Sequence, residues 1–206
     1  MQIPITNFAH VDVWQEIRTE AQRASADEPV LASFYHAAIL NHSSFPAAIS
    51  FHLANKLDSQ ALPAMMLREV FSEAMAADVT IEQAMRADIR AHRERDPACN
   101  KFCMPFLFFK GYHALQSWRI AHWLWLQQRS ALALYFQNQI SETFDVDIHP
   151  GARIGSGIMI DHATGVVIGE TAVIEDDVSM LHDVTLGGSG CMKTDRHPKI
   201  LSLIHI

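Results

Sequence analysis

Glycine is almost missing from the first part of the chain. Of the nine glycines, Gly111 alone precedes residue 151, and the other eight follow. Glycine marks tight turns and close approaches of the backbone, so this shift indicates two kinds of architecture in the 206 residues. We place the boundary near Phe144, which predicts a helical domain over residues 1–144 and a second domain over residues 145–206.

Other shortages exclude whole classes of protein. Three cysteines are too few for a disulfide framework and fit a reducing cytoplasm. A net charge of −7 offers no basic face for nucleic acid. The most apolar segment, residues 120–140, is interrupted by polar residues 127–129, and residues 1–12 lack the features of a signal peptide. We therefore expect a cytoplasmic protein that binds neither membranes nor nucleic acid.

The region before residue 144 has apolar residues at helical spacing. The candidate helices are residues 11–23, 44–57, 63–76, 80–93 and 105–126, with a further apolar run that starts at Pro29. Thr80 is the expected N-cap of the fourth candidate. Asp96 is expected to interrupt the helical structure after Arg93, because the residue before a proline is disfavoured in the helical conformation. The aromatic-rich last candidate fits a core helix or a subunit interface, and both interpretations stay open.

A period of six governs residues 147–187. One column is aliphatic: Ile148, Ile154, Ile160, Val166, Ala172, Val178 and Val184. Three places further on the residues are mostly small: Gly151, Gly157, Ala163, Gly169, Glu175, Leu181 and Gly187. This period is neither that of a helix nor that of an amphipathic strand. It is typical of a left-handed parallel β-helix, whose triangular coils of about 18 residues place the aliphatic column inside. The alternative is an ordinary strand-rich region with a chance run of Ile and Val.

Polar residues at the corners of such coils could carry chemistry. With coils of about 18 residues, position 165 stacks over Asp147, and His162 comes just before that position. A carboxylate beside an imidazole fixes its tautomer and stabilises the imidazolium that forms when the ring accepts a proton. The spacing therefore predicts that His162 is a general base and Asp147 its orienting partner, with no nucleophilic serine.

Two metal sites can also be drawn, and we expect neither. The histidines at 149, 162 and 182 are not spaced by one coil, and no His-x-x-x-His occurs among them. Cys99 and Cys103 lie near His92, but no second ligand pair is within range, so buried thiols are the simpler interpretation.

Several strings identify a resemblance that covers residues 11–200. They are Arg93-Glu94-Arg95-Asp96-Pro97-Ala98, Val146-Asp147-Ile148-His149-Pro150, Asp161-His162-Ala163-Thr164-Gly165, Gly169-Glu170-Thr171, Val184-Thr185-Leu186-Gly187-Gly188 and Asp195-Arg196-His197-Pro198-Lys199-Ile200. With these strings the chain resembles the bacterial serine O-acetyltransferases of cysteine biosynthesis. The resemblance includes the helical half, which other hexapeptide-repeat acyltransferases do not share.

The resemblance implies a reaction. The family transfers acetyl from acetyl-CoA, a co-substrate, to the hydroxyl of L-serine by direct attack, giving O-acetylserine and CoA without a cofactor or metal. It implies that His162 is the base and Asp147 its partner. Asp96 and Asp161 match the residues that hold the serine ammonium. Arg196 matches the residue that holds the carboxylate, His197 completes the pocket, and Gly187 and Gly188 match the backbone beside the thioester.

The resemblance also implies an assembly. The family forms a hexamer, a dimer of trimers, with sites between neighbouring coils and with the helical domains joining the trimers. The tail of family members docks a terminal isoleucine into the next enzyme of the pathway, O-acetylserine sulfhydrylase. Nothing before Ile206 resembles that tail, so we expect no such docking here.

The family pattern stops at Ile200. Residues 201–206 are mostly apolar and contain no glycine. We therefore expect a truncated β-helix, incomplete at its C-terminus, that lacks later coils of the acetyl-CoA groove, frays at its end and has little or no activity. One alternative is an inactive fragment that acts only as an assembly module. Another is a hexapeptide acetyltransferase with a different acceptor, such as a sugar, which would not need the charges of Asp96, Asp161 and Arg196.

Overall fold

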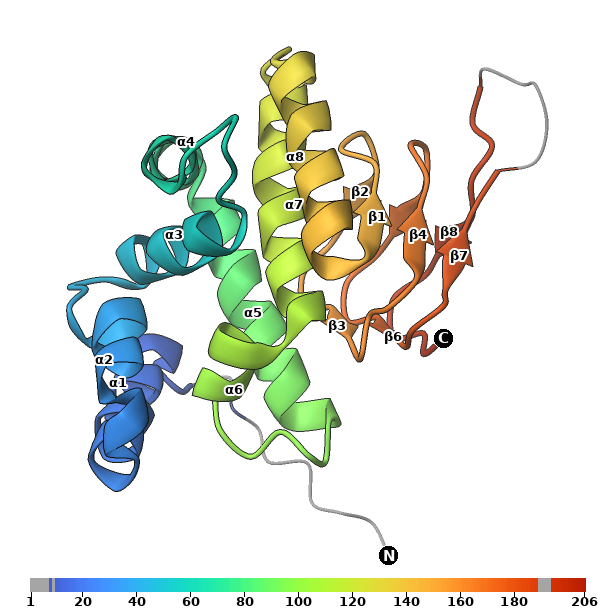
Figure 1. The fold of residues 1–206 in the computed structure, drawn as a ribbon. Coiled ribbons are helices and arrows are strands. Elements are labelled where there is room, and N and C mark those ends of the chain that lie inside the picture. Colours follow the sequence, from blue (N-terminus) through green and yellow to red (C-terminus); the bar gives the residue numbers. More distant parts are fainter. Residues whose placement is uncertain (1–7, 9, 189–193) are drawn as a thin grey trace, which may run out of the picture.

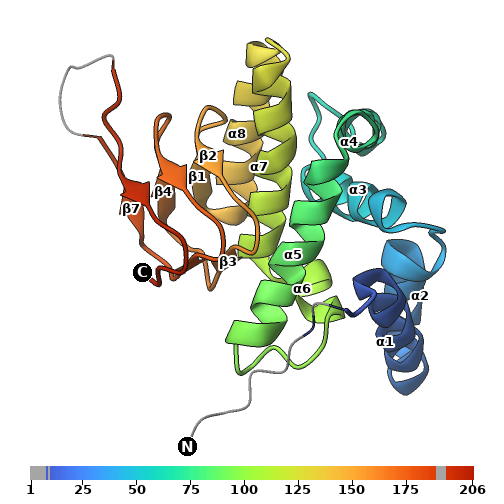
Figure 2. The same cartoon turned by 180° about the vertical axis from the view of Figure 1, so that it is seen from behind.

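The computed structural model describes residue 8, residues 10–188 and residues 194–206. Helices occupy one side of the molecule and short strands the other (Figure 1). Seen from the opposite direction, the strands again lie on one side of helices α7 and α8, and α1 to α4 lie on the other (Figure 2). Helices followed by parallel coils confirm the predicted fold class.

The helical part contains α1 (Val13–Asp27), η1 (Pro29–Leu31), α2 (Ala32–Tyr35), η2 (His36–Leu40), α3 (Phe45–Lys56), α4 (Ala64–Ala77), α5 (Val79–Arg95), α6 (Cys103–Phe108), α7 (Lys110–Leu126) and α8 (Ser130–Phe144). Caps explain several boundaries. Asp12 accepts hydrogen bonds from the backbone of Trp14 and Gln15 at the start of α1, and Ser44 caps α3. Within the described residues, none of the helices combines the length and apolar character needed to cross a bilayer.

Two expectations about helix ends are corrected. The N-cap of α5 is Asp78, whose carboxylate accepts from the Thr80 backbone, so Thr80 lies inside the first turn. The expected helix over residues 105–126 is two helices, because Phe109 is extended, with φ −90° and ψ 107°. This break redirects the chain so that α7 runs along the first coil.

Helix α7 is the core helix of the molecule. It contacts α4, α5, α6 and α8 as well as strands β1 (Val146–Ile148) and β3 (Met159–Ile160). Tyr112, Leu115 and Trp118 are buried on it, which supports the core interpretation of this segment.

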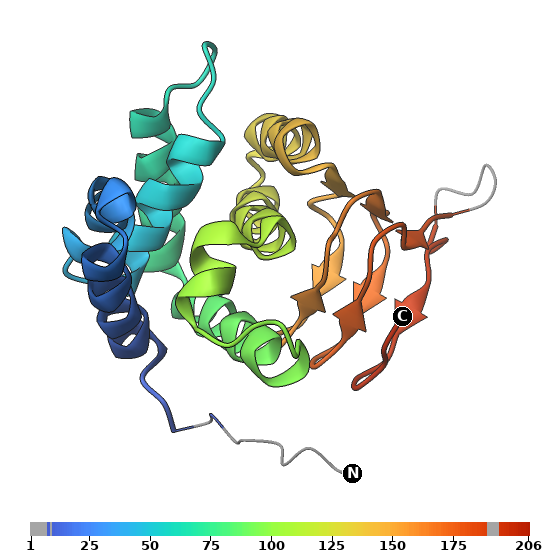
Figure 3. The ribbon, with the colours of Figure 1, turned by 60° about the horizontal axis from the view of Figure 1, so that its bottom comes forward.

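The strands form three parallel sheets, one for each side of the coil (Figure 3). The remaining strands are β2 (Arg153–Ile154), β4 (Val166–Ile168), β5 (Val173–Ile174), β6 (Ser179–Met180), β7 (Thr185–Leu186) and β8 (Lys199–Ile200). The sheet orders are β1-β4-β7, β2-β5-β8 and β3-β6. Successive coils step away from α7 and α8, so the helices cover the first coil.

The predicted register is wrong for the first coil. Val146 pairs with Val166, and Ile148 pairs with Ile168, an offset of 20 residues instead of 18. The offset falls to 18 only between β4 and β7, where Val167 pairs with Thr185. Position 165 therefore does not stack over Asp147, which pairs with Val167. The predicted aliphatic column is therefore two columns. Ile148 stacks on Ile168 and Ile160 stacks on Met180, whereas the prediction placed them on Val166 and Val178.

The end of the chain also differs from expectation. The backbone N–H of Ser179 donates to Ile204 O, and that of Leu181 donates to Ile206 O. Leu203 adopts a left-handed φ of 64° at the corner between β8 and this segment. Residues 201–206 thus continue the third coil, where the sequence predicted a frayed end. The spacing of six between Ile200 and Ile206 preserves the alternation that a further side of the coil requires.

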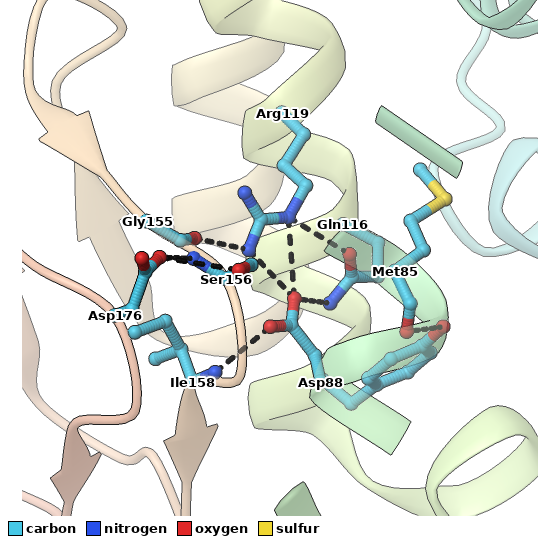
Figure 4. A network of polar contacts seen from close by, with 9 residues as sticks. Met85, Asp88, Gln116, Arg119, Gly155, Ser156, Ile158 and Asp176 are labelled. Carbon is cyan, nitrogen blue, oxygen red and sulfur yellow. Dashed lines mark hydrogen bonds and ion pairs between the residues drawn. The ribbon is translucent and has the colours of Figure 1, made fainter. Parts of the chain in front are cut away.

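A buried polar network fixes the helices to the coil (Figure 4). The Asp88 carboxylate on α5 accepts from Arg119 at 2.7 Å and from Gln116 at 3.0 Å, both on α7. Its other oxygen accepts from the Ile158 backbone at 2.8 Å, and Arg119 also donates to Gly155 O. Asp88 is fully buried, so each of these donors offsets the loss of water around its charge.

Candidate active site

A cavity of about 390 Å³ lies where the end of α5 and the start of α7 meet the first coil. It is lined by Asp96, Ala98, Met104, Phe108, Phe109, Lys110, Gly111, Ile160, Asp161 and His162. Three residues predicted for the site, Asp96, Asp161 and His162, are therefore brought together from the helical part and the coil. They combine two carboxylates with an imidazole, which suits a ligand that carries an ammonium and a hydroxyl.

His162 projects from the corner between β3 and β4. Its side chain is 71% exposed, and Nε2 lies 3.7 Å from the Asp161 carboxylate. The ring of His182, on the next coil, stands edge-on at 5.9 Å between ring centroids. The sequence analysis considered His182 only as a metal ligand. It assumed coils of 18 residues, and the first coil has 20, which brings His182 beside His162.

Asp147 lies on β1 and is not paired with His162 in the single chain. Its Oδ1 accepts a hydrogen bond from Gln137 Nε2 of α8 at 2.7 Å. Across the described residues, no hydrogen bond joins Asp147 to His162. The longer first coil places Asp147 beside Val167 instead of position 165. The Asp147–His162 pairing stays a prediction.

A second group of predicted residues lies at the next corner, between β4 and β5. Arg196 donates to Glu170 Oε2 at 2.7 Å, and this bond lowers the pKa of Glu170. His197 Nδ1 lies 2.8 Å from Thr171 Oγ1. Gly169 must lack a side chain, because a Cβ there would be 2.0 Å from the His197 ring. The roles of Glu170 and Thr171 as anchors were missed, although the Gly-Glu-Thr string contains both.

A cavity of about 430 Å³ lies against this second group. Its lining is Trp125, Gly151, Arg153, Glu170, Thr171, Thr194 and Asp195. His149 is near it, packs edge-on against Trp125 at 5.2 Å, and has a pKa lowered by burial.

Of the two predicted glycines, Gly188 adjoins Arg196, since a Cβ there would be 2.9 Å from Arg196 O. Among the described residues, a Cβ on Gly187 would lie 3.2 Å from the Thr185 side chain. The neighbouring residues 189–193, including Cys191, lie outside the described residues.

The structure thus divides the predicted residues between two corners. Asp96, Asp161 and His162 share one cavity, whereas Arg196 and His197 lie at the other corner. Strands β1, β4 and β7 form the face between these corners, and Asp147 lies on that face.

The described histidines, cysteines and carboxylates do not cluster as metal ligands, and the described cysteines are buried. No group of three or more His, Cys, Asp or Glu is arranged to hold a metal ion in that part of the chain. Cys99 and Cys103 are buried, and burial raises the pKa of each thiol to about 12. Both therefore remain protonated and unreactive at neutral pH.

Three-sided parallel coils with acidic residues and a histidine at their corners fit the class of hexapeptide-repeat acyltransferases. Residues 13–117 match the family model described as serine acetyltransferase, N-terminal. The chain is 57% identical over 188 residues to the serine acetyltransferase of Escherichia coli K12, covering 91% of this chain and 69% of that protein. The chain belongs to the serine acetyltransferase family, which is a family of enzymes.

Solved structures agree with this assignment. A soybean serine acetyltransferase complexed with serine is 51% identical, with a TM-score of 0.91, over 94% of this chain and 79% of that chain. A serine acetyltransferase in complex with CoA is 53% identical, with a TM-score of 0.90, over 95% of this chain and 81% of that one.

Proposed function

We propose that this chain transfers acetyl from acetyl-CoA to the hydroxyl of L-serine, giving O-acetyl-L-serine and CoA. This reaction would be the first step of cysteine biosynthesis from serine. The observation that carries the proposal is the cavity shared by Asp96, Asp161 and His162. The soybean relative complexed with serine and the relative in complex with CoA support the two substrates.

The first group of residues would bind the amine and activate the hydroxyl. Asp96 and Asp161 would hold the serine ammonium, because two carboxylates offer it acceptors and opposite charge. His162 would accept the hydroxyl proton as the serine oxygen attacks the thioester carbonyl. It would return that proton to the CoA sulfur as the carbon–sulfur bond breaks, so neither an acyl-enzyme nor a cofactor is needed. Asp147, held by Gln137, would support the charged imidazole.

The second group would bind the carboxylate. Arg196 presents a planar guanidinium whose fork matches a carboxylate, and Glu170 holds that guanidinium from one side. His197, anchored on Thr171, would complete the pocket. Gly187 and Gly188 would let the backbone approach the thioester, since neither carries a side chain.

The separation of the two groups supports a site completed by a second copy. One serine molecule could not contact groups at two corners of one coil, but a neighbouring coil could bring its second corner beside the first corner of this one. We therefore propose a homo-oligomer built from trimers, paired as a hexamer through the helical domain (residues 1–144), with the coil domain (residues 145–206) carrying the sites. Such rings use heterologous contacts that close after three copies. A cytoplasmic location would supply both substrates.

The test is acetyl-CoA-dependent acetylation with a panel of acceptors. Release of CoA should require L-serine, and O-acetylserine should appear in equal amount by mass spectrometry. An amino sugar should not replace serine, because it has no carboxylate for Arg196. A preference for the sugar would contradict the proposed acceptor. Running the same assay on this chain extended with further repeats asks whether later coils are required.

A further inference from the structure

The corner that carries His162 is longer than the corner stacked on it. Ile160 pairs with Met180, and Val167 pairs with Thr185. Val167 thus follows Ile160 by seven positions, whereas their partners Met180 and Thr185 are only five positions apart. The two additional residues belong to the turn of residues 161–165, which is the turn that presents the proposed base.

This turn has an uncommon backbone. His162 has φ 57°, and Ala163 has φ 64°, so two consecutive residues that are not glycine adopt the left-handed conformation. Such conformations persist only where the surroundings hold them. The coils supply part of that support, since Gly165 N–H donates to Asp145 O at 3.0 Å and Asp183 N–H donates to Thr164 O at 2.8 Å.

The start of α7 supplies the rest. Gly111 packs so closely on the turn that a Cβ would lie 2.2 Å from Ile160 O and 2.9 Å from the Ala163 Cβ. The residue before it, Lys110, donates from Nζ to Thr164 Oγ1 at 2.6 Å. Lys110 also lines the cavity that contains His162. Nothing in the spacing of the sequence connects Lys110 with Thr164.

We propose that Lys110 is a positioning residue for His162 and acts through Thr164. This inference rests on the proposed function, in which His162 is the base. The ammonium of Lys110 tethers the long turn to α7 and thereby fixes the direction of the imidazole. A charge effect on the cavity is the competing explanation, because Asp96 and Asp161 line the same space. The two explanations differ in whether Thr164 is needed.

A double-mutant cycle separates them. Lys110→Met and Thr164→Val should each lower kcat roughly tenfold, because a small misplacement of a catalytic group is costly. KM for acetyl-CoA should hardly change. The double variant should be no worse than either single variant, and Thr164→Ser, which keeps the hydroxyl, should retain the rate. Lys101→Met, at an exposed lysine of the preceding loop, is the matched control.

If the losses of kcat from Lys110→Met and Thr164→Val multiply in the double variant, the two residues act independently and the proposed tether is contradicted. A change confined to KM for serine would also contradict it. Hydrogen exchange provides a readout that does not need activity. Amides of residues 161–166 should exchange faster in Lys110→Met than in Lys101→Met, with the rest of the coil unchanged. If the unaltered chain fails to acetylate serine, the proposed function fails. The exchange measurement then still tests whether Lys110 holds the turn of residues 161–165. Equal exchange in the two variants would contradict it.

Discussion

His162 occupies a position suited to a base that must meet two substrates. It is mostly exposed, stands beside the Asp161 carboxylate, and faces the cavity lined by Asp96. Replacing it with Asn in an active assembly should reduce kcat by roughly 10²- to 10⁴-fold, since general base catalysis contributes about that much. Steady-state CoA release measures this. A variant that keeps more than about a tenth of the rate would remove His162 from this role.

Asp147 should contribute less than His162. Asp147→Asn keeps the shape, and the Asn amide oxygen can still accept the hydrogen bond from Gln137 Nε2. The negative charge is lost, so support of the charged imidazole is weakened while the orientation is largely kept. We expect a smaller loss of kcat than for His162→Asn, with KM for serine little changed. A loss equal to that of His162→Asn would make the carboxylate part of the chemistry itself.

Arg196 should select the carboxylate of the acceptor. Arg196→Lys keeps the charge and loses the fork, so KM for serine should rise while KM for acetyl-CoA stays nearly constant. Arg153→Lys is the matched control, because Arg153 lines the neighbouring cavity without a proposed role. An unaltered serine KM in Arg196→Lys would place this residue outside the acceptor site.

Motifs alone located the charged residues that could act, but not the residues that hold them. Asp96 and His162 were identified from their strings, and the structure places them in one cavity. Lys110 contacts Thr164 and Glu170 contacts Arg196 across long stretches of sequence, and Gln137 on α8 contacts Asp147 on β1. The Gly-Glu-Thr string contains Glu170, but no local pattern predicts any of these contacts.

At the scale of elements, the period of six was a reliable guide to the β-helix and a poor guide to its register. The period reports which residues face inward along each side. It does not report how many residues a corner uses, and the turn at residues 161–165 uses two more than its partner. The break at Phe109 was equally hidden, because both helices that it separates are apolar.

Gly111 tests the contact between α7 and the long turn. Gly111→Ala should lower the free energy of unfolding by roughly 1–3 kcal/mol, because the new Cβ would collide with the Ile160 carbonyl. Gly187→Ala is the control, since the nearest atom of the described residues to a Cβ there lies 3.2 Å away on the Thr185 side chain. Denaturant unfolding compares the two. Equal small losses would mean that α7 can shift without cost.

At the scale of the molecule, buried histidines should make stability depend on pH. Burial lowers the pKa of His52 to about 4 and that of His92 to about 3, whereas an unfolded histidine titrates near 6.5. The unfolded chain therefore binds more protons below about pH 6.5, and stability falls as the pH falls, by about 1.4 kcal/mol per pH unit for each group. Above that range these two histidines contribute no further pH dependence.

His92→Leu should flatten this dependence. Both ring nitrogens of His92 lack a partner among the described residues, and its ring packs on Phe109 and Tyr112, so leucine replaces it without orphaning a donor. His36→Leu, at an exposed position, is the control and should leave the slope unchanged. Denaturant midpoints between pH 7 and pH 5 measure the slope. An unchanged slope in His92→Leu would mean that His92 is protonated in the folded state.

The most direct test of the account is complementation between two inactive chains. His162→Asn and Arg196→Ala would each disable every site in a uniform assembly. If each site takes His162 from one copy and Arg196 from its neighbour, mixed assemblies contain some sites with both native residues. Co-expressed and co-purified variants should then recover serine-dependent CoA release, at about a quarter of the native rate per site for random mixing in closed rings. A mixture no more active than the separate variants would contradict a serine site shared between copies.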